Sequence, residues 1–206
     1  MHALVQNNQI VKFFNYPKSF ELNGNKYSSQ IFQVWTQSEK EAIGIYEVVY
    51  DNSNFKDEQW YINTNQSLAF ANDTVTASYG TATAKAHADT TWSQQDSDDG
   101  DLPSDKSVGD VKTEGLKTTL IRTLKQQVAG ILNDTDWYIT RNAEKSTAIP
   151  SAISTHRDAV RTKQASMETL ITNASNTPAL ETLYTYTEQS DGTVTRPLGE
   201  LPTLEI

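Results

Sequence analysis

The chain of 206 residues contains no cysteine, few basic residues and no long apolar run. Without cysteine it can form neither disulfide bridges nor thiolate metal sites, so its stability must come from packing or from association. Its 17 basic residues stand against 26 acidic ones, which gives a formal net charge of −9 at pH 7. An acidic chain gains little from neutralising phosphates, so nucleic acid is not an expected partner.

Membrane and export signals are also missing from the sequence. No apolar run approaches the roughly 18 residues that a membrane-spanning helix needs. The start, MHALVQNNQIVKFF, does not combine a basic region with an uninterrupted apolar stretch. The sequence therefore predicts a chain that is neither exported nor embedded in a membrane. Hydrophobic residues make up only 36%, which predicts a surface rich in neutral polar side chains.

Residues 1–92 are predicted to form an antiparallel β-rich domain, because short extended runs alternate there with turn residues. Asn23-Gly24 separates two such runs, and both residues tolerate the positive φ of a type I′ hairpin turn. A short helix is expected within residues 30–45, where Ser38 and Glu41 have the spacing of a capping box. Between Asp73 and Trp92 the pattern fits either a strand or a helix. The predicted strands are Ala3–Val5, Ile10–Phe14, Phe20–Leu22, Lys26–Ser28, Ile45–Tyr50, Trp60–Asn63 and Leu68–Phe70.

Residues 93–109 are predicted to be an acidic linker between two domains, because they carry five aspartates and no apolar run. The aspartates also suggest a calcium-binding loop, which needs glycine at position 6 and glutamate at position 12. Counting from Asp96 puts Gly100 at position 5 and Ser107 at position 12. A solvated linker is therefore the preferred interpretation.

Residues 110–183 are predicted to form a helical domain, which makes the fold class α+β. A stripe of apolar residues from Leu116 to Ile131 predicts a helix over 110–132, with Asp110 as its N-cap. The segment Asp136–Ile139 is expected to break this helix. Pro150 then suits the first turn of a second helix that runs to about Ala174.

The second predicted helix carries an incomplete apolar seam. Ile153, Val160, Met167 and Ala174 recur every seven positions, whereas the companion series Ile149, His156, Lys163 and Leu170 is half polar. The sequence therefore predicts an antiparallel helical hairpin rather than a self-sufficient coiled coil. In residues 184–206 the turn at Asp191-Gly192 and two prolines predict an extended tail, or one hairpin, lying on another surface.

The sequence shows no signature of metal or cofactor chemistry. His2, His87 and His156 are far apart, and none has a second ligand at the spacing that builds a metal site on a helix. The nucleophile elbow, the phosphate-binding glycine loop and the dinucleotide fingerprint are absent. We therefore expect no metal, no cofactor and no enzymatic activity.

Aromatic and arginine residues are the candidates for partner binding. Amphipathic rings serve either as core edges or as interface anchors, and the core is the preferred reading except for Trp137, where the two are balanced. Arg157 and Arg161 share one helix face and could pair with Asp134, Asp136 or Glu144. A structural clamp is the preferred role for this pair, with partner binding second. The candidate binding residues are Trp137, Tyr138, Arg141, Arg157, Arg161, Trp60 and Tyr61.

A longer pattern connects several of these residues. A leucine-rich helix is followed by Thr135-Asp136-Trp137, an arginine, Ile149-Pro150 and a helix with Arg157-Asp-Ala-Val-Arg161. This pattern spans Leu116 to Arg161 and resembles the C-terminal region of bacteriophage tail-fibre assembly chaperones and related tail-assembly proteins. The front half, with Trp35 and Ile43-Gly44-Ile45, is similar to proteins found among the tail genes of marine phages.

The resemblance implies a protein made in the cytoplasm of the infected host that binds a tail fibre or a neighbouring tail component. It also implies a subunit of a larger or homo-oligomeric assembly, located on the tail of the virion, with no catalytic residues. Two other functions stay open. The first is a host-surface carbohydrate-binding module at a fibre tip, in which Trp60 and Tyr61 stack on sugars. The second is a polysaccharide-degrading enzyme, which would need convergent carboxylates in a cleft.

Overall fold

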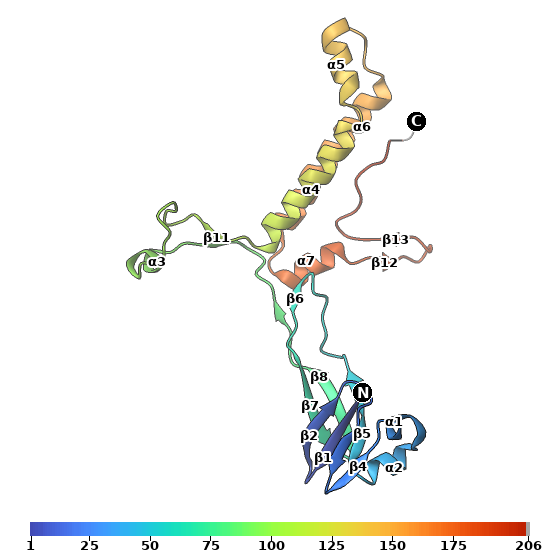
Figure 1. Ribbon diagram of the computed structural model, residues 1–206. Coiled ribbons are helices and arrows are strands. Elements are labelled where there is room, and N and C mark those ends of the chain that lie inside the picture. The colour runs from blue at the N-terminus through green and yellow to red at the C-terminus, as the bar shows by residue number, and fades with distance from the viewer. Residues whose placement is uncertain (205–206) are drawn as a thin grey trace. The chain divides into compact units, whose positions relative to one another are not determined.

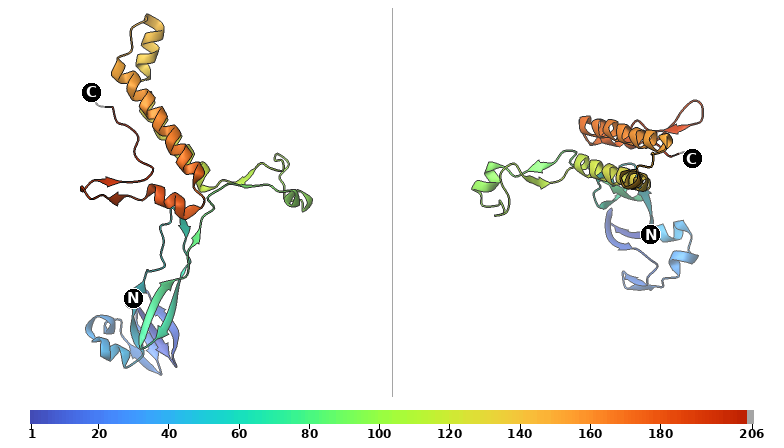
Figure 2. Two further views of the ribbon diagram at one scale, coloured as in Figure 1. Left: turned by 180° about the vertical axis from the view of Figure 1, so that it is seen from behind. Right: turned by 90° about the horizontal axis from the view of Figure 1, so that it is seen from above.

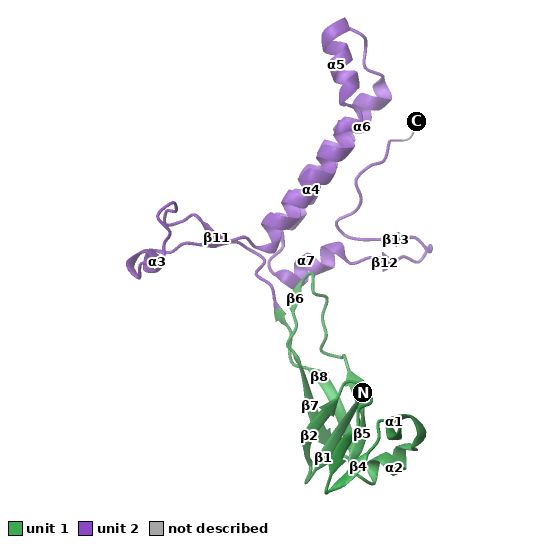
Figure 3. Cartoon of the chain, in the orientation of Figure 1, with its two compact units in different colours: residues 1–83 green, residues 84–206 purple. Residues whose placement is uncertain are grey.

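The computed structural model describes residues 1–204 and divides the chain into two compact units, with the division between Thr83 and Ala84 (Figure 3). The first unit is built mainly from strands and the second mainly from helices, so the chain is α+β, as the sequence predicts. The boundary that the sequence suggested after residue 92 falls inside the second unit. Within residues 1–204, no helix combines the length and the apolar character needed to cross a membrane.

The first unit contains a curled five-stranded sheet with the strand order β2-β1-β5-β8-β7. Its edge strands, β2 and β7, also lie close to each other, which gives the sheet its curl (Figure 1). A separate hairpin, β3–β4, turns at Asn23-Gly24 and confirms the hairpin expected there. The strands of the sheet and this hairpin are β1 (His2–Gln6), β2 (Gln9–Phe14), β3 (Phe20–Leu22), β4 (Asn25–Tyr27), β5 (Ile45–Asp51), β7 (Gln66–Ala71) and β8 (Thr74–Tyr79).

One strand pair is parallel, whereas the sequence predicted successive antiparallel strands. β5 and β8 run in the same direction, with Val48 opposite Val75. The reason lies in β8, which first forms a tight hairpin with β7 through Asn72 and Asp73, both at positive φ. Because β7 occupies one edge of β8, the other edge is free to pair with β5. Val75 is fully buried, as expected for an inner strand that lies between β5 and β7.

Alternating side chains along β1 belong to two hydrophobic clusters on opposite faces of the sheet. Leu4 packs with the aromatic residues of the β3–β4 hairpin and with α1 (Ile31–Val34), whereas Ala3 and Val5 face the other way. The first cluster contains Leu4, Phe14, Phe20, Ile31, Phe32 and Ile45, and the second contains Ala3, Val5, Val48, Val75 and Ala77. The sheet is therefore buried on both faces.

The N-cap of the short helix α2 (Gln37–Glu41) lies two residues before its predicted position. Thr36 and Glu39 form the capping box, rather than Ser38 and Glu41. Thr36 has the extended backbone of an N-cap, and its amide and hydroxyl both donate to the Glu39 carboxylate. These bonds lower the pKa of Glu39. The helix ends at Glu41, and the chain then turns into β5 at Gly44, where φ is +81°.

Gly44 is predicted to be irreplaceable for steric reasons. A Cβ at this position would lie 2.5 Å from the Val5 carbonyl oxygen, whereas a Cβ at Gly24 would meet nothing within 4 Å. Both residues have positive φ, so Gly24→Ala isolates the backbone cost, about 1 kcal/mol. We expect Gly44→Ala to cost about 3 kcal/mol. Urea unfolding followed at an Ile45 methyl resonance measures both, and equal losses would contradict the steric explanation.

His2 makes the stability of the first unit depend on pH. Burial, then the nearby Lys40 ammonium and the terminal amine, lower its pKa below the ordinary 6.5, against a smaller opposing effect of Glu47. The folded state thus favours the neutral imidazole, so this stabilisation is complete above pH 6.5 and is lost as the pH falls through the folded pKa. Between about pH 7 and pH 5, wild type should lose more stability than His2→Gln in urea titrations. Parallel losses in the two proteins would exclude His2 as the cause.

The second unit is organised around four helices and two small hairpins. The helices are α4 (Leu116–Asn133), α5 (Asp136–Lys145), α6 (Ser151–Asn173) and α7 (Thr177–Tyr184). The short elements are α3 (Gln94–Asp98), β10 (Thr90–Thr91), β11 (Val111–Thr113), β12 (Thr187–Glu188) and β13 (Val194–Thr195), while β6 (Tyr61–Ile62) precedes the unit and β9 (Thr83–Ala84) lies at its start. The β12–β13 hairpin confirms the turn expected at Asp191-Gly192.

The first long helix starts at Leu116, not after Asp110 as predicted. Residues 111–113 form β11, and Gly115 is the N-cap. The free amides of the first turn bind residues 86–89: Gly115 donates to the Asp89 carboxylate and Leu116 donates to the Ala86 carbonyl. A Cβ at Gly115 would lie 2.3 Å from the Ala88 backbone, so only glycine allows this approach. A distant segment therefore caps the helix, and sequence spacing could not show it.

The acidic segment 93–109 lies within the second unit, between the paired strands β10 and β11. It is locally structured: Ser93 and Asp96 form a capping box at the start of α3. Lys112 pairs with Asp96 and lies over the Trp92 ring, 4.4 Å from its centroid. The hydrogen bonds to Lys112 and Ser93 hold the pKa of Asp96 well below its usual range. The segment is thus a structured loop of the second unit, closed at its base by the pairing of β10 with β11.

Candidate protein-binding surface on the helical unit

The helices α4 and α6 lie side by side and form the predicted helical hairpin (Figure 2). Leu124 and Val128 are the buried residues of α4, and α6 contributes the predicted series Ile153, Val160 and Met167. The companion positions differ from the prediction. Arg157 and Ile171 are buried and Gln164 between them is half-buried, whereas of the predicted series His156 is buried and Leu170 is exposed. The seam therefore contains a buried arginine at a position where a coiled coil would have an apolar residue.

The predicted break after α4 is a helix of its own. Asp136 is the first residue of α5, and only Asp134 and Thr135 separate the two helices. The sequence suggested a break because the apolar period of α4 ends here. Thr135 is buried, and its hydroxyl donates to the Leu132 carbonyl, so the corner is held by side chain and backbone together. α5 ends at Ser146, which has positive φ.

Arg157 fastens this corner to α6. Its guanidinium donates to the Leu132 carbonyl oxygen and to the Thr135 hydroxyl, each at 2.7 Å, and pairs with the Asp136 carboxylate at 2.8 Å. The side chain is buried, so these three acceptors replace its hydration. Pairing with Asp136 was one of the predicted possibilities. The Thr135-Asp136 part of the motif therefore has a structural role as the receptor of Arg157.

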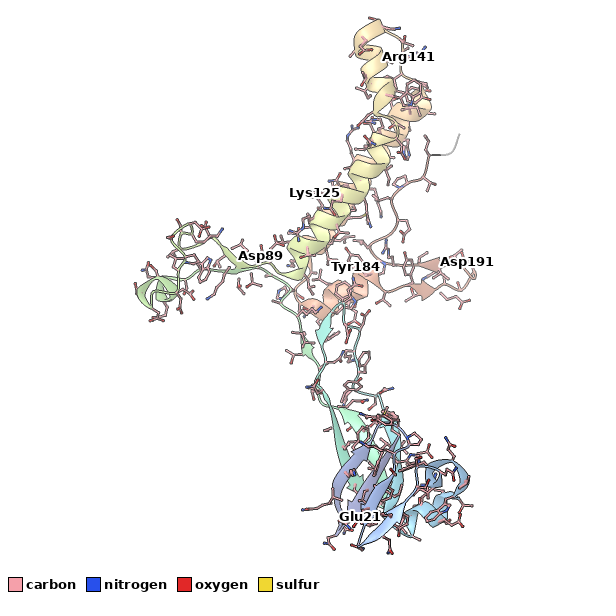
Figure 4. All side chains as sticks on the ribbon, viewed as in Figure 1. Glu21, Asp89, Lys125, Arg141, Tyr184 and Asp191 are labelled. Atoms are coloured by element: carbon pink, nitrogen blue, oxygen red, sulfur yellow. The ribbon has the colours of Figure 1, made fainter. Side chains whose placement is uncertain are left out.

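The residues that follow Asp136, the ion-pair partner of Arg157, form an exposed aromatic surface on α5. The Trp137 and Tyr138 rings have centroids 3.7 Å apart, and the Arg141 guanidinium carbon lies 6.0 Å from the Trp137 ring. Trp137 is 50% exposed. Figure 4 shows Arg141 on α5 and Lys125 on the neighbouring α4. We call Trp137, Tyr138 and Arg141 the α5 surface.

The remaining candidate residues lie elsewhere. Arg161 is exposed and pairs only loosely with Asp158, at 3.4 Å on the same helix. Trp60 belongs to the first unit and is 3% exposed, so its ring is not available for stacking on a sugar. Tyr61 is half-buried and has the Lys56 ammonium 5.8 Å from its ring. The structure therefore brings together Trp137, Tyr138 and Arg141, with Arg157 behind them.

The tail contains a cluster that the sequence analysis missed. The Arg196 guanidinium lies between the Tyr184 and Tyr186 rings, at 5.5 and 5.0 Å, and pairs with Glu200 at 2.7 Å. Tyr186 donates to Glu200, which raises the pKa of Tyr186. Leu198 is buried, and a Cβ at Gly199 would collide with the Lys163 side chain, so the tail lies along α6. The only sequence signal was the Arg–Glu spacing of four residues.

Comparison with known proteins found no matching family model, no matching curated protein and no matching solved structure. The resemblance to tail-assembly proteins therefore stays a prediction from the motif between Leu116 and Arg161. Two of its residues, Asp136 and Arg157, contact each other in the structure. Function is therefore inferred from the motif and from the geometry around it.

Replacing Arg157 should loosen the corner between α4 and α5. Arg157→Met keeps most of the side-chain volume but leaves the buried Thr135 hydroxyl and the Leu132 carbonyl without this donor. We expect a loss of roughly 3 kcal/mol, because the variant removes three bonds of a buried charged donor, although Thr135 and Leu132 keep their bond to each other. Arg161→Met, at the exposed site one turn away, should stay within about 0.5 kcal/mol of wild type. Urea unfolding, monitored by far-UV circular dichroism, compares the two variants. Equal losses would contradict the role of Arg157 in holding the corner between α4 and α5.

Proposed function

We propose that this protein is a phage tail-associated structural or assembly protein that binds a tail fibre or a neighbouring tail component through the α5 surface. The proposal combines the motif resemblance with the position of Trp137 directly after the residues that hold Arg157. The same motif thus contains a structural part and an exposed part. The exposed part is the proposed contact.

The observation that carries the proposal is the exposure of Trp137 beside Tyr138 and Arg141 on a fixed helix. Tryptophan, tyrosine and arginine are the residues enriched at the energetic centres of protein interfaces. Their exposure costs solvation energy that burial against a partner would recover. Because Arg157 fixes α5 before binding, little conformational entropy would be lost on association.

The proposed partner surface combines an apolar pocket for the Trp137 ring with acidic or carbonyl groups facing Arg141. An arginine donates in a fixed plane and therefore favours carboxylates and backbone carbonyls at defined positions. The chain is further proposed to act within a homo-oligomer or a multi-subunit assembly, and to need no cofactor for this role. Its proposed locations are the virion tail and the host cytoplasm during assembly.

Removing the α5 surface should abolish partner capture without unfolding the chain. Trp137→Ala combined with Arg141→Ala removes two exposed side chains, so the circular dichroism spectrum should match wild type. We expect affinity for the tail component to fall by roughly 100-fold, as for loss of an interface hot spot. The measurement is affinity purification from infected cells followed by quantitative mass spectrometry. Tyr16→Ala, which removes an exposed ring from the other unit, is the matched control.

Two results would contradict the proposal. One is an unchanged yield of tail proteins with the double variant, and the other is wild-type capture that contains no tail component. Mass spectrometry of mature particles separates the two forms of the proposal. A fixed copy number on particles identifies a virion subunit, whereas abundance in the lysate alone identifies a transient assembly chaperone.

A further inference from the structure

The first unit contains a polar pocket of about 540 Å³ that the proposed function does not use. It lies where the turns β1–β2 and β3–β4 meet the residues between α2 and β5. Gln6, Asn7, Asn23, Asn25 and Tyr27 are its polar lining residues. We call this site the amide pocket, because four of these five side chains are amides.

The four amide side chains have unused hydrogen-bonding capacity. Within residues 1–204, none of the four side chains forms a hydrogen bond with another part of the chain. Asn7 and Asn23 also serve their turns, since both have positive φ. Gln6 and Asn25 lie beside the turns in strands, where local geometry does not call for an amide. Both side chains are accessible to solvent, so their amides are available to bond a ligand in the pocket.

The pocket contains no charged lining residue, although charged residues make up 21% of the chain. A phosphate, sulfate or carboxylate ligand would need cationic partners, and an ammonium ligand would need anionic ones. The lining offers neither. Each amide presents two N–H donors and a carbonyl acceptor, so the pocket suits a neutral ligand that both donates and accepts.

Tyr27 gives the pocket an aromatic surface held in a fixed orientation. Its ring stacks on Phe20 at 5.2 Å and meets the Trp35 ring edge-on at 6.0 Å. Gly44 lies in a second wall of the pocket, and its carbonyl oxygen accepts a hydrogen bond from the Val5 amide at 2.8 Å. A side chain at this position would collide with the Val5 backbone, so only glycine allows the approach. Tyr27 therefore connects one wall of the pocket to the hydrophobic core.

We propose that the amide pocket binds a neutral saccharide. Sugar hydroxyls both donate and accept hydrogen bonds, which matches the amides, while the C–H face of a sugar ring can cover the apolar face of Tyr27. Uncharged lining matches a sugar without carboxylate, sulfate or phosphate. The site differs from the one expected from the sequence, which relied on Trp60 and Tyr61; of these, Trp60 is buried in the first unit and Tyr61 is half-buried.

The test is binding of the full chain to a glycan array that carries neutral, sialylated and sulfated glycans. Signal should be confined to neutral glycans. The double variant Gln6→Ala, Asn25→Ala should weaken binding to the strongest of them about tenfold, because it removes two ligand hydrogen bonds. Gln33→Ala, an exposed amide on α1 of the same unit, should leave binding unchanged.

Absence of binding to every neutral glycan overturns the proposal, as does preference for charged glycans or full retention of binding by the double variant. If the double variant instead loses capture of a tail protein, the pocket binds a polypeptide and the saccharide assignment is wrong. The outcome is separable from that of the α5 surface, because the two sets of variants lie in different units.

Discussion

A single buried cation determines the arrangement of the helical half of this protein. The Arg157 guanidinium reaches the end of α4, the corner residue Thr135 and the first residue of α5 from a position inside the helical seam. An apolar residue there would pack well enough but would leave α5 without a fixed direction. A buried, paired charge instead fixes the direction of α5, since only one geometry satisfies its hydrogen bonds. The orientation of α5, and with it the α5 surface, follows from that geometry.

The sequence predicted those parts of the fold that depend on neighbouring residues. The Asn23-Gly24 hairpin and the second long helix were found because turn residues and apolar periodicity act locally. The parallel pairing of β5 with β8 and the start of α4 at Gly115 were not found. Both depend on partners that lie far away in sequence. Nothing near Leu116 indicates that Asp89 supplies its cap.

The candidate binding residues show the same distinction. Trp137, Tyr138 and Arg141 are close in sequence, so helical geometry brings them together once α5 forms. Trp60, like Trp137, is a tryptophan among polar residues in the sequence, and yet it is buried, because exposure depends on tertiary packing. The Arg196 cluster with Tyr184 and Tyr186 was also beyond sequence reasoning. Cation–π contacts need an orientation of rings that spacing alone does not give.

The pairing of β8 with β5 has a consequence for synthesis of the chain on the ribosome. β1, β2 and β5 emerge first and can pair, but the outer edge of β5 stays open until β8 follows. Val48 of β5 can pair only after Val75 of β8 has been synthesised, and the intervening residues include the whole of β7. The nascent chain therefore carries an unpaired hydrophobic strand edge for as long as that stretch takes to translate. Codons that slow translation between β5 and β8 would lengthen this exposure and favour aggregation of the newborn chain.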